Sequence, residues 1–486
     1  MPQLNPDLDH LLRRAGFGAG PMDIDAFRDM SASAAAASLI NYEGRPDDVD
    51  GRIGRADHAQ VTTRELFTPD TDIEDARQRW LFRMIHTQRP LQEKMALFWH
   101  NHFATAYSKL VADSGATQAA KMLAAKPGAL RGPQGQLELF RQYALGSFRD
   151  LLINVAQDPA MLVWLDGKSN TRAKPQENFG REVMELFTVG VGNYTEPDVY
   201  AAARVFSGWN LRQSDGYRST DPNAYQEFVY NADQHELSAK TFSFPIYSDG
   251  SKTIPARSES AGMQDGLDLI AALALNPETA RRLARKLWQF FVSDLQPPDP
   301  GFVESTAAVY LQNGTNMRPV VRYILTSRWF NDPSMRFTRY SWPTEFVTRA
   351  IKEVGWQGYS LDKARAPLNN MGQLLFEPPN VGGWPLGAGW FSTGTMLART
   401  NFASALVTTQ KETLASAMQT DAGSAQMLVT KMLDRLTTAP LDAAPQQALM
   451  SYLIAGGPWT GSATQLNTRA AGLARLLVGS SEYQLV

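Results

Sequence analysis

Apolar residues recur every three to four positions along most of this chain, which is the spacing of an amphipathic helix. One helix is expected after Asp72 and a second from Pro90 towards His102, because proline suits the first turn of a helix. Further helices are expected at 136–157, 177–190, 196–208, 262–275, 278–293, 301–312, 343–354, 394–416 and through 424–480. The pattern predicts a mainly α-helical protein with a multi-helical globular body.

Residues 226–245 depart from this pattern. Phe228, Val229 and Tyr230, and later residues 241–244, are mostly the β-branched and aromatic types that favour strands. A polar segment, NADQHELSAK, separates the two runs. Two such runs around a polar loop predict one small β-hairpin inserted into the helical body near 226–245.

The length of the chain bears on its domain organisation. It has 486 residues, whereas a single hydrophobic core rarely exceeds about 250–300 residues. We therefore expect two packed lobes. Residues 1–330 would hold the candidate site helices and the β insertion, and residues 331–486 would hold a tryptophan-containing loop and the C-terminal helices.

Composition removes several classes of function. The chain has no cysteine, which excludes disulfides, thiolate nucleophiles and cysteine-ligated metals. Its net charge of −2 gives no reason to expect a nucleic-acid partner. No apolar run approaches the roughly 18 residues of a membrane span. The start, MPQLNPDLDHLLRR, lacks the basic and apolar regions of an export signal, so a cytoplasmic location is expected unless a signal has been removed.

The first candidate site is a polar stripe on the helix expected at 177–190. Asn178, Glu182 and Glu185 fall on one helical face, where two carboxylates and an amide are able to bind a divalent metal ion or share a proton. In the alternative interpretation, Arg181 pairs with Glu177 and Glu185 on a solvated face. Composition alone favours this alternative, because charge stripes usually face water.

The second candidate site is the segment WHNHF at residues 99–103, which holds two of the six histidines. His100 and His102 diverge by about 200° on a regular helix, so they could share a metal only if the helix ends there. His102 is expected on the face of Trp99 and Phe103. A structural pair of hydrogen-bonded histidines and a functional pair fit the pattern equally well.

Two more candidates lie in irregular segments. His235, in the polar loop of the expected hairpin, suits a ligand or an acid–base group, although loop histidines are often merely solvated. The Pro- and Gly-rich residues 376–385, with Trp384 and the following Trp390, predict a rigid loop whose tryptophans either stack on a sugar ring or pack onto the body as a plug. A solvated helix face without a function is expected of four basic residues, Arg281, Arg282, Arg285 and Lys286.

The motifs around these candidates also resemble a known bacterial family. In order along the chain they are HLLRR (10–14) with GFG (16–18), WHNHF (99–103), DPAM (158–161), residues 178–190, Ala203-Arg204 with Gly208-Trp209, PETA (277–280), Pro343 with Glu345, and PPNVGGWP (378–385). Over residues 8–405 the chain resembles the family catalogued as domain of unknown function 1800. The resemblance implies that residues 1–486 form a single family-length unit.

This resemblance carries no established activity. It implies that members are often exported, and that they are often encoded beside a second exported family that looks like alkaline phosphatases and sulfatases. It therefore leaves a periplasmic or exported location open and suggests a partner. The family pattern emphasises a set of residues that shifts the polar stripe towards a functional role: Trp99, His100, His102, Asn178, Arg181, Glu182, Glu185 and Trp384.

Two functions of different classes follow. The first is a hydrolase acting on an envelope polymer or a sugar- or phosphate-bearing substrate through a pocket of His and Glu residues. Its catalytic or metal-binding groups would be Glu182, Glu185, His100 and His102, and its substrate-binding groups would be Asn178, Arg181, His235, Trp209, Trp384 and Trp390. The second is a non-catalytic binding or assembly partner of the co-encoded exported protein. The first predicts that His100 or His102 lies within hydrogen-bond reach of Glu182 or Glu185.

Overall fold

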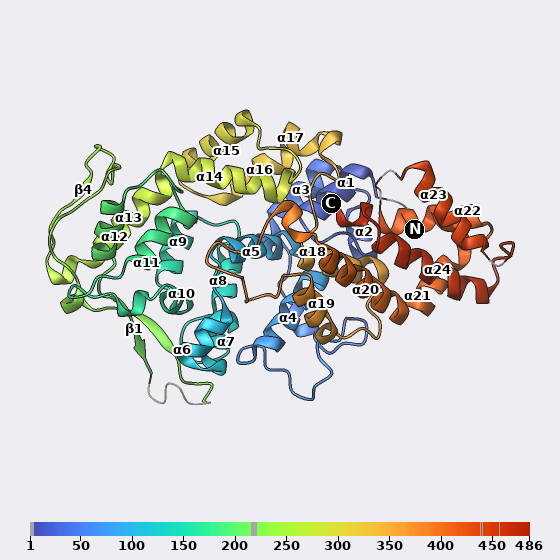
Figure 1. Cartoon of the computed structure of the whole chain (residues 1–486), viewed down its shortest axis with the longest axis horizontal. Helices are drawn as coiled ribbons and strands as arrows, with labels where there is room; N and C mark the ends of the chain where they lie inside the picture. Colours follow the sequence, from blue (N-terminus) through green and yellow to red (C-terminus); the bar gives the residue numbers. More distant parts are fainter. Residues whose placement is uncertain (1–3, 215–220, 438, 440, 456) are drawn as a thin grey trace.

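The computed structural model describes residues 4–214, 221–437, 439, 441–455 and 457–486. The protein is mainly helical, as its periodicity predicts, and its long axis runs from the segment around β4 and α12 to the C-terminal helices (Figure 1). None of the helices in the described part of the chain is long and apolar enough to cross a membrane. The expected division near residue 330 stays a prediction.

The first third of the chain supplies the centre of the molecule. Its helices are α1 (Pro6–Arg14), α2 (Pro21–Phe27), α3 (Ala32–Ile40), α4 (Ile73–His86), α5 (Pro90–His102), α6 (Tyr107–Ser114), α7 (Ala116–Ala124), α8 (Gln136–Gln142), α9 (Phe148–Ala156) and α10 (Pro159–Trp164). The Asp72 carboxylate caps α4, and Pro90 begins α5 as expected. The helix expected over 136–157 is broken, because Ser147 caps a new helix there.

The middle of the chain contains two places where an α-helix continues as a π-helical turn. The helices are α11 (Glu177–Glu182) with η4 (Val183–Phe187), α12 (Glu196–Val205), α13 (Met263–Leu275), α14 (Pro277–Leu287) with η7 (Trp288–Val292), α15 (Pro300–Gln312), α16 (Met317–Thr326) and α17 (Arg328–Asn331). The expected helices at 177–190 and 278–293 are therefore present but not regular. A π turn rotates the following side chains away from their positions on an α-helix.

A small amount of antiparallel β structure is present as predicted, and the expected region 226–245 holds β2 and β3, but the partner of each strand lies outside that region. Strand β1 (Trp209–Gln213) pairs antiparallel with β2 (Gln226–Tyr230), and β3 (Lys240–Thr241) pairs with β4 (Thr253–Ile254). The two runs expected to form one hairpin thus belong to two separate pairs. The pattern missed this because WNLRQ at β1 contains few β-formers and follows directly on a helix.

The last third of the chain forms seven further helices of the described structure, and its final residues pack against the start of α18. Its helices are α18 (Pro343–Val354), α19 (Arg365–Asn370), α20 (Thr393–Thr409), α21 (Lys411–Met418), α22 (Ala425–Leu436), α23 (Ala443–Ile454) and α24 (Ala463–Val478). Single 3-10 turns lie at Tyr42–Gly44, Val49–Arg52, Gly167–Ser169, Ala232–Gln234, Glu259–Ala261, Pro333–Met335, Leu361–Ala364, Gly387–Trp390, Gln419–Asp421 and Glu482–Gln484.

Residues 482–486 lie in the middle of the molecule, where Figure 1 marks the C-terminus beside α18 and α1. The amide of Ser341 donates to the Gln484 carbonyl at 2.8 Å, and that of Val486 donates to the Arg339 carbonyl at 2.9 Å. The buried guanidinium of Arg349 donates to the Tyr483 carbonyl at 3.1 Å and lies 3.7 Å from the centre of that residue's ring. This segment therefore completes the hydrogen bonding of α18 and the loop before it.

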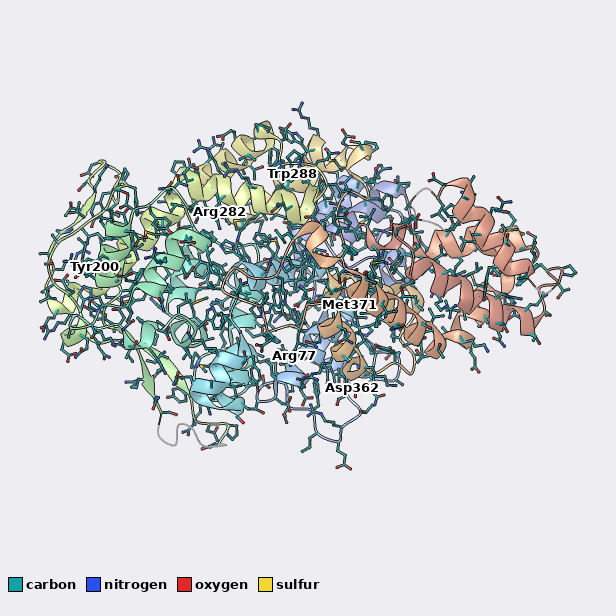
Figure 2. The ribbon with its side chains drawn as sticks, viewed as in Figure 1. Arg77, Tyr200, Arg282, Trp288, Asp362 and Met371 are labelled. Carbon is teal, nitrogen blue, oxygen red and sulfur yellow. The ribbon has the colours of Figure 1, made fainter. Side chains whose placement is uncertain are left out.

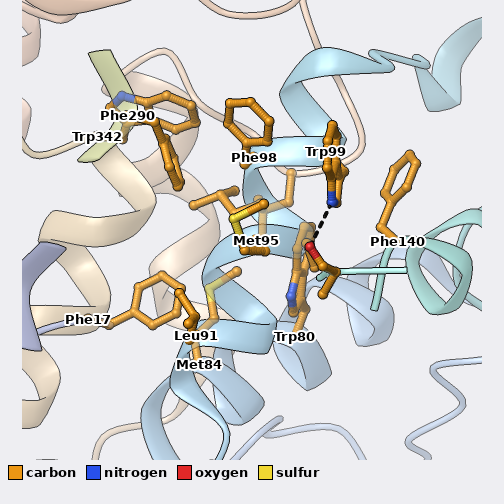
Figure 3. Packing of buried hydrophobic residues seen from close by; sticks show 14 of the residues in the cluster. Phe17, Trp80, Met84, Leu91, Met95, Phe98, Trp99, Phe140, Phe290 and Trp342 are labelled. Atoms are coloured by element: carbon orange, nitrogen blue, oxygen red, sulfur yellow. Dashed lines mark hydrogen bonds between the residues drawn. The ribbon is translucent and has the colours of Figure 1, made fainter. Parts of the chain in front are cut away.

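The core around α4 and α5 combines large apolar side chains with buried charges. Trp80 and Trp99 stand among phenylalanines and methionines (Figure 3). Beside them, the fully buried Glu93 carboxylate accepts hydrogen bonds from Arg83 and Arg141 at 2.9 Å each and from Trp80 at 3.1 Å. These bonds join α4, α5 and α8. A buried charge of this kind is stable only while its partners remain.

Replacing Glu93 tests this dependence. Glu93→Gln would leave Arg83 and Arg141 buried with less negative charge, so we expect the free energy of unfolding to fall by about 3–5 kcal/mol in urea denaturation. Glu304→Gln is the control, because Glu304 is an exposed partner of Arg281 and its loss should leave the midpoint nearly unchanged. Equal effects of the two substitutions would contradict a structural role for the buried charges.

Candidate functional site

Consecutive side chains at the end of α5 each bind a different distant segment. Trp99 Nε1 donates to the Ala144 carbonyl at 3.2 Å, the bond drawn as a dashed line in Figure 3. His100 Nε2 accepts the amide of Phe376 at 3.0 Å. All of these side chains arise in the WHNHF segment. The polar residues of this motif are therefore buried connections, and α5 ends at His102.

Asn101 holds the tryptophan loop in place. Its Oδ1 accepts the amide of Trp384 at 2.7 Å, and the Trp384 ring lies 5.2 Å from the His100 ring, centre to centre. Gly383 makes this approach feasible: a Cβ there would lie 2.5 Å from the Asn101 carbonyl oxygen, and its φ is +87°. The loop folds over the end of α5 and packs its Trp384 there.

A cavity of about 430 Å³, including its open mouth, lies between α5, η7 and this loop. Its apolar walls include Phe98, Phe290 and Trp342, which stand together at one end of the core in Figure 3. The complete set of lining residues is Phe98, Asn101, His102, Lys286, Phe290, Trp342, Gly382, Trp384 and Leu386. Aromatic walls with a few polar groups are typical of small-molecule sites.

The polar centre of the cavity is the contact between His102 and Lys286. His102 Nε2 lies 3.0 Å from the Phe187 carbonyl, which can only accept, so this nitrogen carries the proton. His102 Nδ1 is then the acceptor for Lys286 Nζ, at 3.0 Å. The two partners come from the ends of α5 and α14, and Phe187 is the last residue of the π turn η4. This geometry fixes a neutral imidazole against an amine.

Arg282 lies one helical turn before Lys286, and Figure 2 locates it on α14. Its Nη2 donates to the Leu186 carbonyl at 3.2 Å, while its Nε is buried without a hydrogen-bond partner. Among the residues described, no carboxylate forms an ion pair with Arg282 or Lys286. The expectation of a solvated face is wrong for these two residues, because both turn towards the interior.

Burial sets the charge states here. Desolvation, with a smaller effect of Arg282, lowers the pKa of Lys286 to about 7. Desolvation, followed by Lys286 and Arg282, holds the pKa of His102 well below its usual value. The imidazole is therefore neutral at neutral pH, and the Lys286 amine is divided between its charged and neutral forms. An amine that titrates near pH 7 is able to move a proton in either direction.

None of the three residues of the polar stripe on α11 and η4, Asn178, Glu182 and Glu185, lines this cavity. The π turn shifts Glu185 out of line with Glu182, and Asn178 is exposed and donates to Asp166 at 2.9 Å. Glu185 accepts a hydrogen bond from the Tyr194 hydroxyl. Glu182 is half-buried, and desolvation followed by Glu185 raises its pKa.

Arg181 forms ion pairs with Glu177 and Glu196 on the surface. Pairing with Glu177 was expected, whereas its second partner is Glu196 instead of Glu185. The WHNHF segment and this helix do meet, but through His102 and the Phe187 carbonyl instead of a glutamate. No contact between either histidine and Glu182 or Glu185 is present in the described part of the chain.

His235 is buried rather than solvated. Its Nδ1 donates to the Ser207 carbonyl at 2.7 Å, and its Nε2 lies 3.2 Å from Asp265 Oδ2. Ser207 Oγ is 3.5 Å from the imidazole and directs its own proton to the Arg204 carbonyl at 2.7 Å. The Ser–His–Asp arrangement is thus a structural network with no nucleophile aligned on the histidine.

The remaining candidates are core residues. Trp209 packs edge-to-face against Phe206 and Phe228, and Trp390 packs against Trp342, one wall of the cavity. Within the described residues, no group of three or more His, Asp or Glu side chains is arranged to hold a metal ion. Of the residues predicted from sequence, His102 and Trp384 line the cavity.

Sequence reasoning missed Lys286 as a site residue, although a signal was present. Arg282, Lys286 and Phe290 follow at intervals of four, and the last of them is an obvious core residue. Charges aligned with a buried aromatic residue lie beside the apolar stripe, not opposite to it. Arg285, which is exposed, shows what the solvated face of the same helix looks like.

Substituting glycine in the loop tests its attachment to α5. Gly383→Ala places a Cβ against Asn101 at a positive φ, so we expect a loss of roughly 1–3 kcal/mol and faster hydrogen exchange of the Trp384 amide. Gly382→Ala is the control, since its nearest neighbour is the Asn380 side chain at 3.1 Å and its φ is not positive. Unchanged protection of the Trp384 amide in Gly383→Ala would argue against the anchoring role of Asn101.

The buried histidines predict acid sensitivity. Burial, with a smaller effect of Arg77, lowers the pKa of His100 to about 3, so the unfolded chain binds this proton first as the pH falls. The resulting stability is fully present above about pH 6.5 and declines below it by about 1.4 kcal/mol per pH unit for this residue. We expect His100→Gln to flatten the dependence of unfolding free energy on pH by that amount between pH 6.5 and 5. An unchanged slope would mean that His100 is already charged in the fold.

Comparison with known protein families gives one match, which covers nearly the whole chain. The family described as protein of unknown function (DUF1800) matches residues 10–485, which includes the C-terminal helices beyond the motifs recognised in the sequence. No curated protein and no solved structure matches the chain. Because the match covers nearly the whole sequence, this protein belongs to the DUF1800 family.

Proposed function

We propose that this protein is an enzyme of the hydrolase class whose active site is the cavity between α5, η7 and the tryptophan loop, and whose substrate is an anionic, sugar- or phosphate-bearing molecule. The observation that carries the proposal is Lys286: an amine at the wall of a 430 Å³ cavity, in contact with a neutral imidazole and with no carboxylate partner among the described residues.

The preference for an anion follows from charge. Arg282 and Lys286 place two basic groups in one interior region, and removing cations from water is unfavourable unless an opposite charge compensates. Burial lowers the pKa of Arg282 and the charge of the Glu185 carboxylate opposes that shift, but the two side chains form no ion pair. A phosphate or carboxylate on the substrate would supply the missing charge.

The preference for a ring follows from the walls. Trp342, Trp384 and Phe98 offer flat apolar faces on which a sugar ring would stack, and Asn101 adds an amide at the same wall. An envelope polymer would enter with one of its residues through the open mouth.

The reaction class follows from the amine. A group that titrates near neutral pH suits general base catalysis, in which Lys286 would take a proton from the attacking water and His102 would hold the amine in position. This proposal moves the acid–base role from Glu182 and Glu185 to Lys286. The two glutamates keep, as an alternative, their predicted role as an acid–base or cation-binding pair.

The binding test uses glucose 6-phosphate and glucose, measured by calorimetry. We expect saturable binding of the phosphorylated sugar, and at least about a tenfold loss of affinity in Lys286→Gln, which removes a charge-assisted bond. Arg285→Gln removes an exposed charge from the same helix and should bind like the parent. Equal affinities of the parent and Lys286→Gln would remove Lys286 from the site.

A turnover assay distinguishes a hydrolase from a non-catalytic binding partner. Hydrolysis of p-nitrophenyl phosphate or a p-nitrophenyl glycoside should be lost in Lys286→Gln and kept in Glu182→Gln and Glu185→Gln. Loss in the glutamate variants, reversed or mimicked by a chelator, would return the reaction to the polar stripe. Binding without turnover of any substrate would favour the non-catalytic partner of the co-encoded exported protein.

A further inference from the structure

The neutral form of a lysine amine is a nucleophile as well as a base, and Lys286 differs from other buried lysines in what surrounds it. We propose that Lys286 is a covalent site, in which its amine condenses with the carbonyl carbon of a small anionic aldehyde or ketone and forms an imine inside the cavity. This inference rests on the proposed function in one respect, that the cavity is the ligand site.

The first support is a comparison among lysines. Lys94 Nζ bonds the Glu345 carboxylate and the Gly16 carbonyl, the latter at 2.9 Å. Lys240 Nζ bonds the Asp265 carboxylate at 2.6 Å. Lys121 Nζ bonds two carbonyl oxygens, at 2.8 and 3.1 Å. The partners of these three lysines are carboxylates and carbonyl oxygens, whereas the partner of Lys286 is the uncharged Nδ1 of His102.

The second support is the direction of the amine. One N–H of Lys286 points at His102 Nδ1, and the residue itself lines the cavity. In the neutral amine the lone pair is therefore free on a side other than the imidazole. The neighbouring walls, Phe98, Phe290 and Trp342, offer no competing acceptor that would hold the nitrogen elsewhere.

The residues around Lys286 also favour imine formation. Lysines that form imines are activated by an apolar pocket or by a second cation close by. Lys286 has both, since aromatic residues surround it and Arg282 lies one helical turn away. The titratable groups near it are the neutral His102 from α5 and the charged Arg282 from its own helix, with Glu185 acting on Arg282 from η4.

The reaction balances without an oxidant or reductant. The Lys286 nitrogen attacks the carbonyl carbon, so that a C–N bond forms and the C=O π pair moves to oxygen. His102 Nδ1 accepts a proton from the nitrogen and returns it to the oxygen, which gives a carbinolamine. A second proton transfer along the same path releases water and leaves C=N. The sum is amine plus carbonyl compound giving imine plus water.

The anionic group sets the substrate class. Arg282 does not line the cavity, but its charge lies one helical turn from Lys286 and would favour a ligand with a carboxylate or phosphate next to the carbonyl, as in a 2-oxo acid or a phosphorylated aldehyde. A neutral aldehyde of similar size lacks this attraction and should react more slowly. The cavity would thus select its ligand by charge before the covalent step.

The experiment traps the imine in the full-length protein. Glyoxylate is added with cyanoborohydride, and the modified lysines are identified by peptide mass spectrometry. We expect Lys286 to be labelled at least about a hundredfold faster at pH 7 than surface lysines, because roughly half of it is uncharged while only about one in 2,500 of a typical lysine is. Its labelling rate should level off above about pH 8. Propanal should label it more slowly than glyoxylate.

Matched variants exclude a general effect of burial. Lys286→Arg should lose the adduct and keep its thermal midpoint, and Lys109→Arg, a half-exposed lysine, should label like the parent. Lys94 should stay unlabelled, since its nitrogen is held by a carboxylate. His102→Gln keeps an acceptor for the amine but cannot carry its proton, so it should slow trapping at every pH without unfolding the protein.

The outcomes distinguish this inference from the proposed function. Labelling of Lys286 no faster than that of surface lysines overturns the covalent site, even if glucose 6-phosphate binding still depends on Lys286. Selective trapping of glyoxylate at Lys286 supports it, even if no phosphorylated sugar binds and no ester is hydrolysed. Equal labelling of Lys286 and Lys94 would reduce the effect to burial and would also overturn the proposal.

Discussion

The structure depends on one constraint, that polar side chains buried at the end of α5 must find partners. His100, Asn101 and His102 each satisfy this with a segment far away in sequence, and together they bring the tryptophan loop, η4 and α14 to one place. The cavity exists because these three segments meet around a short helix terminus without filling the space between them. The same hydrogen bonds that hold these segments together therefore also define the walls of the cavity.

Helical periodicity predicted most of the fold because the apolar stripes are long and regular. The apolar pattern does not show where α11 and α14 change to π turns, because the partners at the ends of these turns come from distant segments: the Phe187 carbonyl accepts from His102, and the Val292 carbonyl accepts from Arg14. The prediction of strand pairing was wrong because it also depended on a segment that the pattern did not identify. The register of β2 is set by β1, whose sequence, WNLRQ, resembles a loop more than a strand.

The candidate site was predicted in part. His102 and Trp384 stand out in sequence as unusual residues inside motifs, and both reach the cavity. Glu182 and Glu185 stood out equally, yet both are half-buried outside the cavity, since a helix stripe alone does not tell which segments it meets. Lys286 was hidden in a basic run in which three of the four residues are arginines. The contacts of Arg282 with the Leu186 carbonyl and of Lys286 with His102 distinguish these inward charges from the exposed Arg285, and the four-residue spacing to Phe290 was the signal in the sequence.

The return of residues 482–486 to the centre has a consequence for the order of folding. Arg349 and Arg399 obtain acceptors from Tyr483 and Gln484, which lie 134 and 85 positions further along the chain. Pairings across such long stretches close late, because the loop entropy is lost before the contact is gained. Residues 482–486 are therefore expected to join α18 after its nearer contacts have formed, and a variant in which these residues are altered would leave Arg349 and Arg399 without these two acceptors.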